Sequence, residues 1–315
     1  MIPGLVCMSH TPLLDRNRPD PQVEKRFNAA VTQSSQKIAD WEPDLCVVFF
    51  PDHFNGFFYD LMPSFCVGVR ANSVGDYGTT PGSLRIPEEL ALDCARACLA
   101  DGVDVAISYR MIVDHGAAQP IELLSEVASI TRIIPIFINC AAAPRPTFAR
   151  VRELGAAVGR WAAAREERIL IIGSGGLSHD PPIPSMATAS PEVQAGLIDG
   201  RNPDHAARVL RQNRVLGLGR AFAAGETPVR PINPEWDAKF LEALQSGSTT
   251  FCDQWSEDEL TEQAGRGGHE VRTWIAGFSA LQAGGGYQAD VAFYDPIREW
   301  ITGTAVATAT PLRAA

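Results

Sequence analysis

Short apolar segments rich in β-branched residues alternate along this chain with longer, alanine-rich segments. The short segments have the length and composition of buried strands, and the long ones have the length of helices. Such alternation predicts an α/β fold with a central mixed sheet flanked by helices on both faces. Strands are expected at 2–9, 45–50, 65–69, 103–109, 133–139 and 168–173, and helices at 22–39, 87–101, 120–127, 147–166, 204–224, 237–245, 256–264 and 270–281.

The strand pattern fades after about Pro181, and residues 181–284 are expected to be mostly helical and to pack on the same core. We therefore predict one catalytic α/β domain over residues 1–303. Residues 304–315 (TAVATATPLRAA) show no clear periodicity. We expect them to form a flexible C-terminal tail or to contact a neighbouring subunit.

Charge and cysteine content narrow the class of protein. The formal net charge of −10 disfavours binding to nucleic acid or to an anionic membrane surface. No run of about 18 apolar residues is present, which argues against a membrane span, and no basic leader region precedes the first apolar segment. Seven scattered cysteines without paired spacing predict reduced thiols and a cytoplasmic location.

Four of the six histidines follow apolar segments: His10, His53, His115 and His179. Ligand sites in α/β proteins lie beyond the carboxyl ends of the strands, so these side chains are expected to share one pocket. Imidazole is the commonest metal ligand and the usual proton carrier near neutral pH. A single such histidine is as often a core residue bonded to a backbone carbonyl as it is a residue of a functional site, but four such histidines together favour a site.

A non-haem iron site needs two histidines and one carboxylate on one face of the metal. His10 and His53 are the best candidates because they follow the first two central strands. Glu270, in GRGGHEVRTWIAGF, is the candidate carboxylate; alternatively, it only stabilises the positive end of a helix. His115 and His179 then remain for acid and base roles. The glycines near His179 match neither a P-loop nor a serine-hydrolase elbow.

These motifs, in this order, resemble the class III extradiol ring-cleavage dioxygenases, a group that includes the large subunit of protocatechuate 4,5-dioxygenase. The resemblance covers about residues 4 to 300. The matching segments are MSHTP, PDHFNGF, VDHG, GSGGLSH, NPEWDAKFL and GHEVRTW.

The resemblance implies that His10, His53 and Glu270 bind Fe(II), that His179 is the catalytic base and that His115 is the acid. It further implies a catechol-type small-molecule substrate and O2 as reactants in aromatic-compound catabolism, and a homo-oligomer. The substrate expected from the closest resemblance is 3-(2,3-dihydroxyphenyl)propionate, or 2,3-dihydroxycinnamate. Opening of the propionate's ring beside the two hydroxyls gives 2-hydroxy-6-oxonona-2,4-dienedioate.

Two other functions use the same residues. A zinc or manganese metallohydrolase also accepts two histidines and a glutamate, with His179 as base. A non-enzymatic binding relative could retain the fold. For the substrate carboxylate, candidate partners are Arg70, Arg110, Arg168, Arg272 and Asn55, whereas Asp237 is expected to cap a helix or hydrogen-bond near the site.

Overall fold

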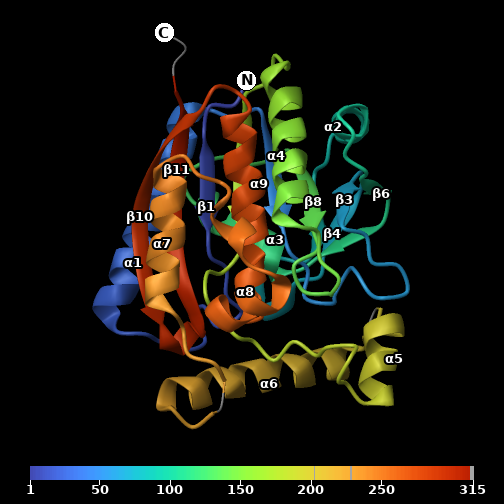
Figure 1. Ribbon diagram of the computed structural model, residues 1–315, viewed down its shortest axis with the longest axis vertical. Coiled ribbons are helices and arrows are strands. Elements are labelled where there is room, and N and C mark those ends of the chain that lie inside the picture. The colour runs from blue at the N-terminus through green and yellow to red at the C-terminus, as the bar shows by residue number, and fades with distance from the viewer. Residues whose placement is uncertain (202, 228, 313–315) are drawn as a thin grey trace.

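Eight strands form one mixed sheet in the order β10-β11-β1-β9-β2-β8-β3-β6 (Figure 1). The structure, a computed structural model, describes residues 1–201, 203–227 and 229–312. The four central strands are parallel, while β11 and β3 run antiparallel to their inner neighbours. The predicted central mixed sheet is therefore confirmed. Its strands are β1 (Leu5–Met8), β2 (Leu45–Phe50), β3 (Phe65–Gly68), β6 (Ala106–Ser108), β8 (Ile133–Ile138), β9 (Ile169–Ser174), β10 (Tyr287–Ile297) and β11 (Thr302–Pro311).

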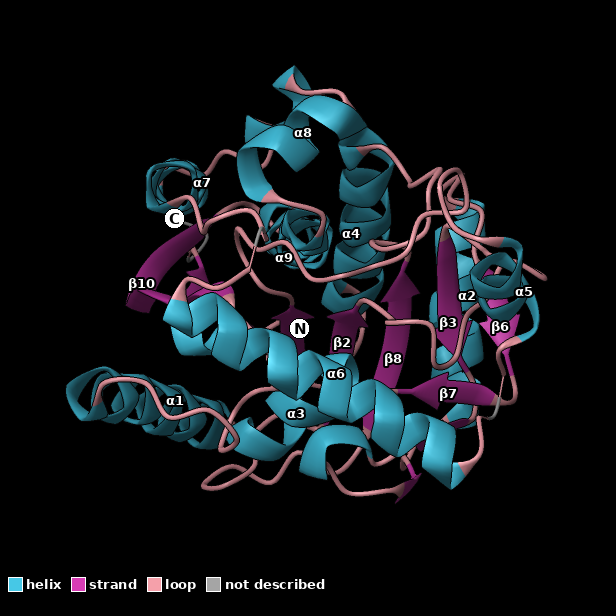
Figure 2. Ribbon diagram, turned by 90° about the horizontal axis from the view of Figure 1, so that it is seen from below, coloured by secondary structure: helices cyan, strands magenta, loops and turns pink. Residues whose placement is uncertain are grey.

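Helices cover both faces of this sheet, as predicted. Figure 2 shows α4 and α9 on one side of the strands and α1 and α3 on the other. The helices are α1 (Pro21–Trp41), α2 (Glu88–Ala100), α3 (His115–Leu124), α4 (Phe148–Ala163), α5 (Pro191–Asp199), α6 (His205–Ala224), α7 (Pro234–Gln245), α8 (Glu257–Ala264) and α9 (Val271–Gln282). None of the helices in the described ranges is both long and apolar enough to cross a membrane.

The central strands are apolar throughout because both of their faces are covered. In β1, Leu5 and Cys7 join the apolar cluster under α4 and α9, while Val6 and Met8 join the cluster under α1 and α3. This alternation is the two-residue period of a strand, and burial of both faces gives the continuous apolar runs seen in the sequence. The parallel arrangement brings the carboxyl ends of β1, β2 and β9 to one edge of the sheet.

Two glycines allow α4 and α9 to pack closely. A Cβ atom on Gly155 or Gly159 would meet the backbone carbonyl oxygen of Ala276 or Ala280 on the facing helix. The close contact fixes the position of α9 relative to α4. Because Glu270 immediately precedes α9, it also fixes where that carboxylate lies.

The prediction of a flexible tail from residue 304 is wrong for the described residues. β11 lies between β10 and β1, and eight of its ten residues are buried. Its sequence is small and β-branched, so no strong local pattern marks it as a strand. The pairing that stabilises it is with β1, about 300 residues earlier in the chain. Residues 313–315 lie outside the described residues.

A second, three-stranded sheet, β5-β4-β7, was not predicted. It consists of β4 (Ala71–Ser73), β5 (Gly82–Ser83) and β7 (Met111–Val113). The strand expected at 103–109 is observed only in part, as β6. His115 does not follow that strand directly but comes after β7. β7 pairs in parallel with β4, and a short 3-10 helix, η1 (Asp76–Gly78), follows β4. The small sheet thus brings η1 close to His115.

Candidate metal centre

All five residues predicted for the site come together at the carboxyl edge of the central strands. His10 follows β1, His53 follows β2, and His179 follows β9. His115 is the first residue of α3, and Glu270 ends the 3-10 helix η3 (Gly267–Glu270) that leads into α9. Glu270 was expected in the first turn of the helix, but it lies at the N-cap position of α9, just before that turn.

Three side chains bring possible ligand atoms to within 3.5 Å of one another. His10 Nε2 lies 3.4 Å from His53 Nε2 and 3.5 Å from Glu270 Oε2, and His53 Nε2 lies 3.2 Å from Glu270 Oε1. Ligands about 2.1 Å from a metal and at right angles around it are about 3 Å apart. The spacing therefore fits a divalent transition metal held by two imidazoles and one carboxylate.

His10 is held by hydrogen bonds that leave its Nε2 available. Its Nδ1 lies 2.9 Å from the hydroxyl of Ser174, and that hydroxyl donates to the carbonyl of Gly116. His10 Nδ1 must therefore donate the proton, and Nε2 carries the lone pair. Burial lowers the pKa of His10 to about 3, so the ring is neutral, as a metal ligand must be.

His53 is oriented by Asp114. The Asp114 carboxylate accepts hydrogen bonds from the His53 ring Nδ1 at 3.0 Å, from the His53 backbone N–H at 2.9 Å and from Asn55 at 2.8 Å. Burial alone would lower the pKa of His53, but the charges of Asp114 and Glu270 outweigh it and hold that pKa well above its ordinary value. A metal that binds at Nε2 must therefore displace a proton.

The Glu270 carboxylate is fixed by a backbone donor. Its Oε2 accepts from the N–H of Gly176 at 2.8 Å. Burial would raise the pKa of Glu270, but the neighbouring His10 and His179 outweigh it and hold the pKa well below the usual range. The group is therefore an anionic ligand. A Cβ on Gly175 would lie 2.7 Å from the Glu270 carbonyl oxygen, so this approach requires glycine.

His115 lies against the ring of His53, with centroids 4.6 Å apart and planes 20° from parallel. Asp76, in η1, accepts from its ring Nδ1 and from its backbone N–H, both at 2.7 Å. This arrangement fixes the tautomer and leaves Nε2 as the exchangeable position. His10, His53 and His115 together also have nitrogen atoms within 4.8 Å of one another, so distance alone does not separate His115 from the ligands.

His179 stands on the other side of Glu270. Its Nδ1 donates to the Leu177 carbonyl at 2.8 Å, and its Nε2 lies 3.5 Å from Glu270 Oε1. Burial opposes a charge on this ring, but the Glu270 charge outweighs burial and raises the pKa of His179 above its ordinary value. An imidazole so placed can take up a proton at Nε2 and hold it beside the cluster.

Comparison with known proteins gives the family. The family model for the catalytic LigB subunit of aromatic ring-opening dioxygenase matches residues 4–305. The chain belongs to the LigB family. LigB-family relatives named 2,3-dihydroxyphenylpropionate/2,3-dihydroxicinnamic acid 1,2-dioxygenase share about half of its residues. The protein from Rhodococcus jostii (strain RHA1) is 52% identical over 97% of this chain and 98% of its own length, and that from Paraburkholderia xenovorans (strain LB400) is 48% identical over 98% of each.

A solved structure shows the same fold at much lower sequence identity. An uncharacterized protein from Escherichia coli K12 aligns over 96% of this LigB-family chain and 98% of its own, with a TM-score of 0.53 and 15% identity. This likeness shows a shared fold.

Three residues that hold the histidines were not predicted: Asp76, Asp114 and Ser174. Asp114 directly precedes His115, and its position in VDHG was the only local signal. Asp76 is 39 residues from the histidine that it contacts, and Ser174 is 164 residues from His10. Asp237 does not bind at the cluster; it accepts hydrogen bonds from the Ser178 backbone N–H and hydroxyl, beside His179.

Of the candidate partners for a substrate carboxylate, three arginines have other contacts. Arg70 pairs with Glu88, Arg168 pairs with Glu42 and Asp44, and the buried Arg272 contacts His269 and stacks on Phe148. Arg110 is exposed.

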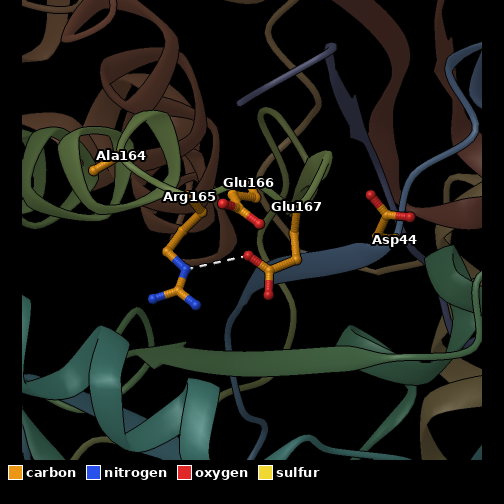
Figure 3. Close-up of a pocket in the computed structure, with 5 residues that line it drawn as sticks. All are labelled: Asp44, Ala164, Arg165, Glu166 and Glu167. Atoms are coloured by element: carbon orange, nitrogen blue, oxygen red, sulfur yellow. Dashed lines mark hydrogen bonds and ion pairs between the residues drawn. The ribbon is translucent and has the colours of Figure 1, made fainter.

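A polar hollow lies at the opposite edge of the sheet (Figure 3). Asp44 precedes β2 there, and residues 164–167 precede β9, with Arg165 and Glu167 paired at 3.2 Å. Its lining consists of three carboxylates, one arginine and one alanine, and it lies apart from the five residues predicted for the site.

Proposed function

We propose that this protein is an Fe(II)-dependent extradiol dioxygenase that opens the ring of 3-(2,3-dihydroxyphenyl)propionate, and of 2,3-dihydroxycinnamate. The observation that carries the proposal is the buried cluster of two imidazoles and one carboxylate with two further histidines beside it. The names of the LigB-family relatives at about 50% identity support the substrate. The product of the propionate is 2-hydroxy-6-oxonona-2,4-dienedioate.

We propose His10, His53 and Glu270 as the residues that hold iron. The donor set of two neutral nitrogens and one anionic oxygen is the one that non-haem iron oxygenases use, with positions left open for substrate and oxygen. When bound, Fe(II) supplies the redox chemistry through which a catechol reacts with dioxygen. Ser174 and Asp114 orient the imidazoles so that both Nε2 atoms point at the same position.

We propose His179 as the base and His115 as the acid. His179 Nε2 is positioned beside Glu270, where it can take a proton from a catechol hydroxyl as the substrate binds. His115 stacks on His53 and holds its proton-exchanging Nε2 away from Asp76, so it can deliver a proton to the oxygen that departs during ring opening. The surrounding side chains of His10, His115 and Glu270 are at most 4% exposed, which limits water at this point.

The first test is oxygen uptake after anaerobic loading with Fe(II). We expect stoichiometric uptake with 3-(2,3-dihydroxyphenyl)propionate and a new yellow ring-fission absorbance, with slower turnover of catechol and protocatechuate. Absence of uptake with every catechol, despite bound metal, would instead favour the zinc or manganese metallohydrolase or the binding relative. Hydrolytic activity after loading with zinc or manganese in place of iron would then favour the metallohydrolase, and its absence would favour the binding relative.

Substitutions separate ligands from proton carriers. We expect His10→Ala and Glu270→Gln to lose iron, as measured by metal analysis after desalting. His115→Ala and His179→Ala should retain iron and lose about 10²- to 10⁴-fold in turnover. Glu262→Gln, at an exposed position of α8, is the control and should behave as the wild type. Full iron content in the ligand variants would contradict the assignment.

We also propose that the protein acts in the cytoplasm as a homo-oligomer. Seven buried free thiols, with no disulfide among the described residues, support a reducing compartment. Sedimentation of the purified protein tests the oligomer, and a monomer at micromolar concentration would contradict it.

A further inference from the structure

Helix α6 has an unusual charge for this chain. Its 20 residues include four arginines and no acidic residue, whereas the whole chain has a net charge of −10. The arginines are Arg208, Arg211, Arg214 and Arg220. A local positive surface on an acidic protein attracts anionic ligands to that place.

The helix lies across the edge of the sheet that carries the site. Figure 2, seen from below, shows α6 crossing in front of the central part of the sheet. Arg211 donates to the backbone carbonyls of His53 and Phe54. Arg208 donates to the carbonyl of Val74 at 3.2 Å, two residues before the Asp76 that orients the proposed acid. Both arginines therefore reach the loops that form the site.

Access to the cluster is on the same side. The side chain of His53 is 19% exposed and that of His179 is 12% exposed, whereas those of His10 and Glu270 are at most 4% exposed. A ligand must therefore enter past His53 and His179. A catechol bound through its oxygens would extend its side chain back toward this opening, where Arg211 contacts the His53 loop.

The two guanidinium groups have unused donors. A guanidinium has five N–H groups. Arg208 Nε is buried without a hydrogen-bond partner, and among the described residues both arginines donate hydrogen bonds only to backbone carbonyls and form no ion pair with a carboxylate. Burial raises the pKa of the Tyr77 phenol and the Arg211 charge opposes this rise, which indicates that Arg211 is near Tyr77. The Tyr77 ring in turn packs edge-on against His115, with centroids 4.9 Å apart.

We propose that Arg208 and Arg211 form the subsite for the carboxylate of the substrate side chain, so that the enzyme selects catechols with an anionic side chain. Arginine suits this role because its planar fork binds a carboxylate through two parallel hydrogen bonds. The inference rests on the proposed function, since it concerns the side chain of the same substrate. It also explains why α6 carries arginines toward a site that is otherwise built from imidazoles and acids.

A purely structural role predicts a different result. If the arginines only tether α6 to the loops, their loss should weaken every catechol equally. If they bind the carboxylate, their loss should affect only the anionic ligand. A matched pair of ligands therefore separates the two roles: 3-(2,3-dihydroxyphenyl)propionate and its primary amide, which has the same shape and no charge.

The experiment is anaerobic calorimetric titration of the Fe(II)-loaded enzyme with each compound. We expect Arg208→Gln and Arg211→Gln to bind the propionate about 10- to 100-fold more weakly and the amide within about twofold of the wild type. Arg211→Lys, which keeps the charge, should recover part of the loss. Arg220→Gln, exposed on the same helix, is the control for net charge and should match the wild type.

The outcomes separate this inference from the proposed function. Equal loss of affinity for both compounds, or no loss for either, overturns the carboxylate subsite while the ring-cleavage function stands. Failure of the wild type to bind either compound overturns the proposed function, and the subsite with it. Selective loss of the propionate, with iron content unchanged, supports the subsite independently of turnover.

Discussion

Replacement of Asp237 by asparagine should change how the stability of the protein depends on pH. Asp237 is fully buried, and its two oxygens accept hydrogen bonds from the Ser178 backbone N–H at 2.7 Å and from the Ser178 and Tyr294 hydroxyls at 2.8 Å. Burial raises the pKa of Asp237 to about 6, against the lowering effect of these bonds. An asparagine has the same shape and no charge; its Oδ1 can still accept from the Ser178 backbone N–H, but its NH2 group donates where Asp237 Oδ2 accepts from the two hydroxyls.

The magnitude follows from the difference in pKa between folded and unfolded states. An unfolded aspartate has a pKa of about 3.9, so the folded value is about two units higher. Below about pH 3 the carboxyl is protonated in both states and costs no stability. As the pH rises from about 3 to 7 the unfolded state loses its proton first, and the wild type loses about 3 kcal/mol of unfolding free energy in all, of which about 2 kcal/mol falls between pH 4.5 and 7.5. Asp237→Asn should not show this loss.

The assay is urea unfolding of metal-free wild type and variant at several pH values from 4.5 to 7.5. Any packing defect of the asparagine is independent of pH, so only the change in the difference between the two proteins matters. Asp104→Asn, at an exposed position, is the control. Stability curves for wild type and Asp237→Asn that remain parallel over this range would refute the argument.

Three further predictions test how the site and core are held. Asp114→Asn should weaken iron binding by about 10- to 100-fold, because the His53 imidazole loses its anionic hydrogen-bond partner. Competition with a chelator measures this affinity, and an unchanged value would argue that Asp114 does not support His53 as a ligand. Asp76→Asn should keep iron and slow ring opening by at least about tenfold, and a wild-type rate would count against it. Gly155→Ala should cost about 1–3 kcal/mol in urea unfolding, because the new methyl meets α9, whereas Gly217→Ala, with open space around it, should be neutral or stabilising by up to about 1 kcal/mol.

The sequence predicted the central sheet and the five site residues because local signals mark both. β-branched runs gave six of the eight main strands, and each strand-end histidine stands directly after such a run or close to one. β11 was missed because its small residues and threonines lack a strong apolar pattern and its pairing with β1 is long-range. β10 is an edge strand in which Asp295 and Pro296 interrupt the apolar residues. Asp76 was missed because its contact is with a histidine 39 residues away. Arg211 was missed because, in sequence, it looks like any arginine on an exposed helix.

The position of β11 has a consequence for how the protein folds during its synthesis. β1 leaves the ribosome before its partners on either side, β9 and β11, which are synthesised about 160 and 300 residues later. The Ser9 amide, next to His10, bonds to the carbonyl of Ala305, and Gly303 exchanges backbone hydrogen bonds with residues 177 and 178, beside His179. Such distant pairings form late, so the first strand must remain without its neighbours through most of translation. The strand that positions His10 therefore gains both of its neighbouring strands only after the residues of β11 have been synthesised.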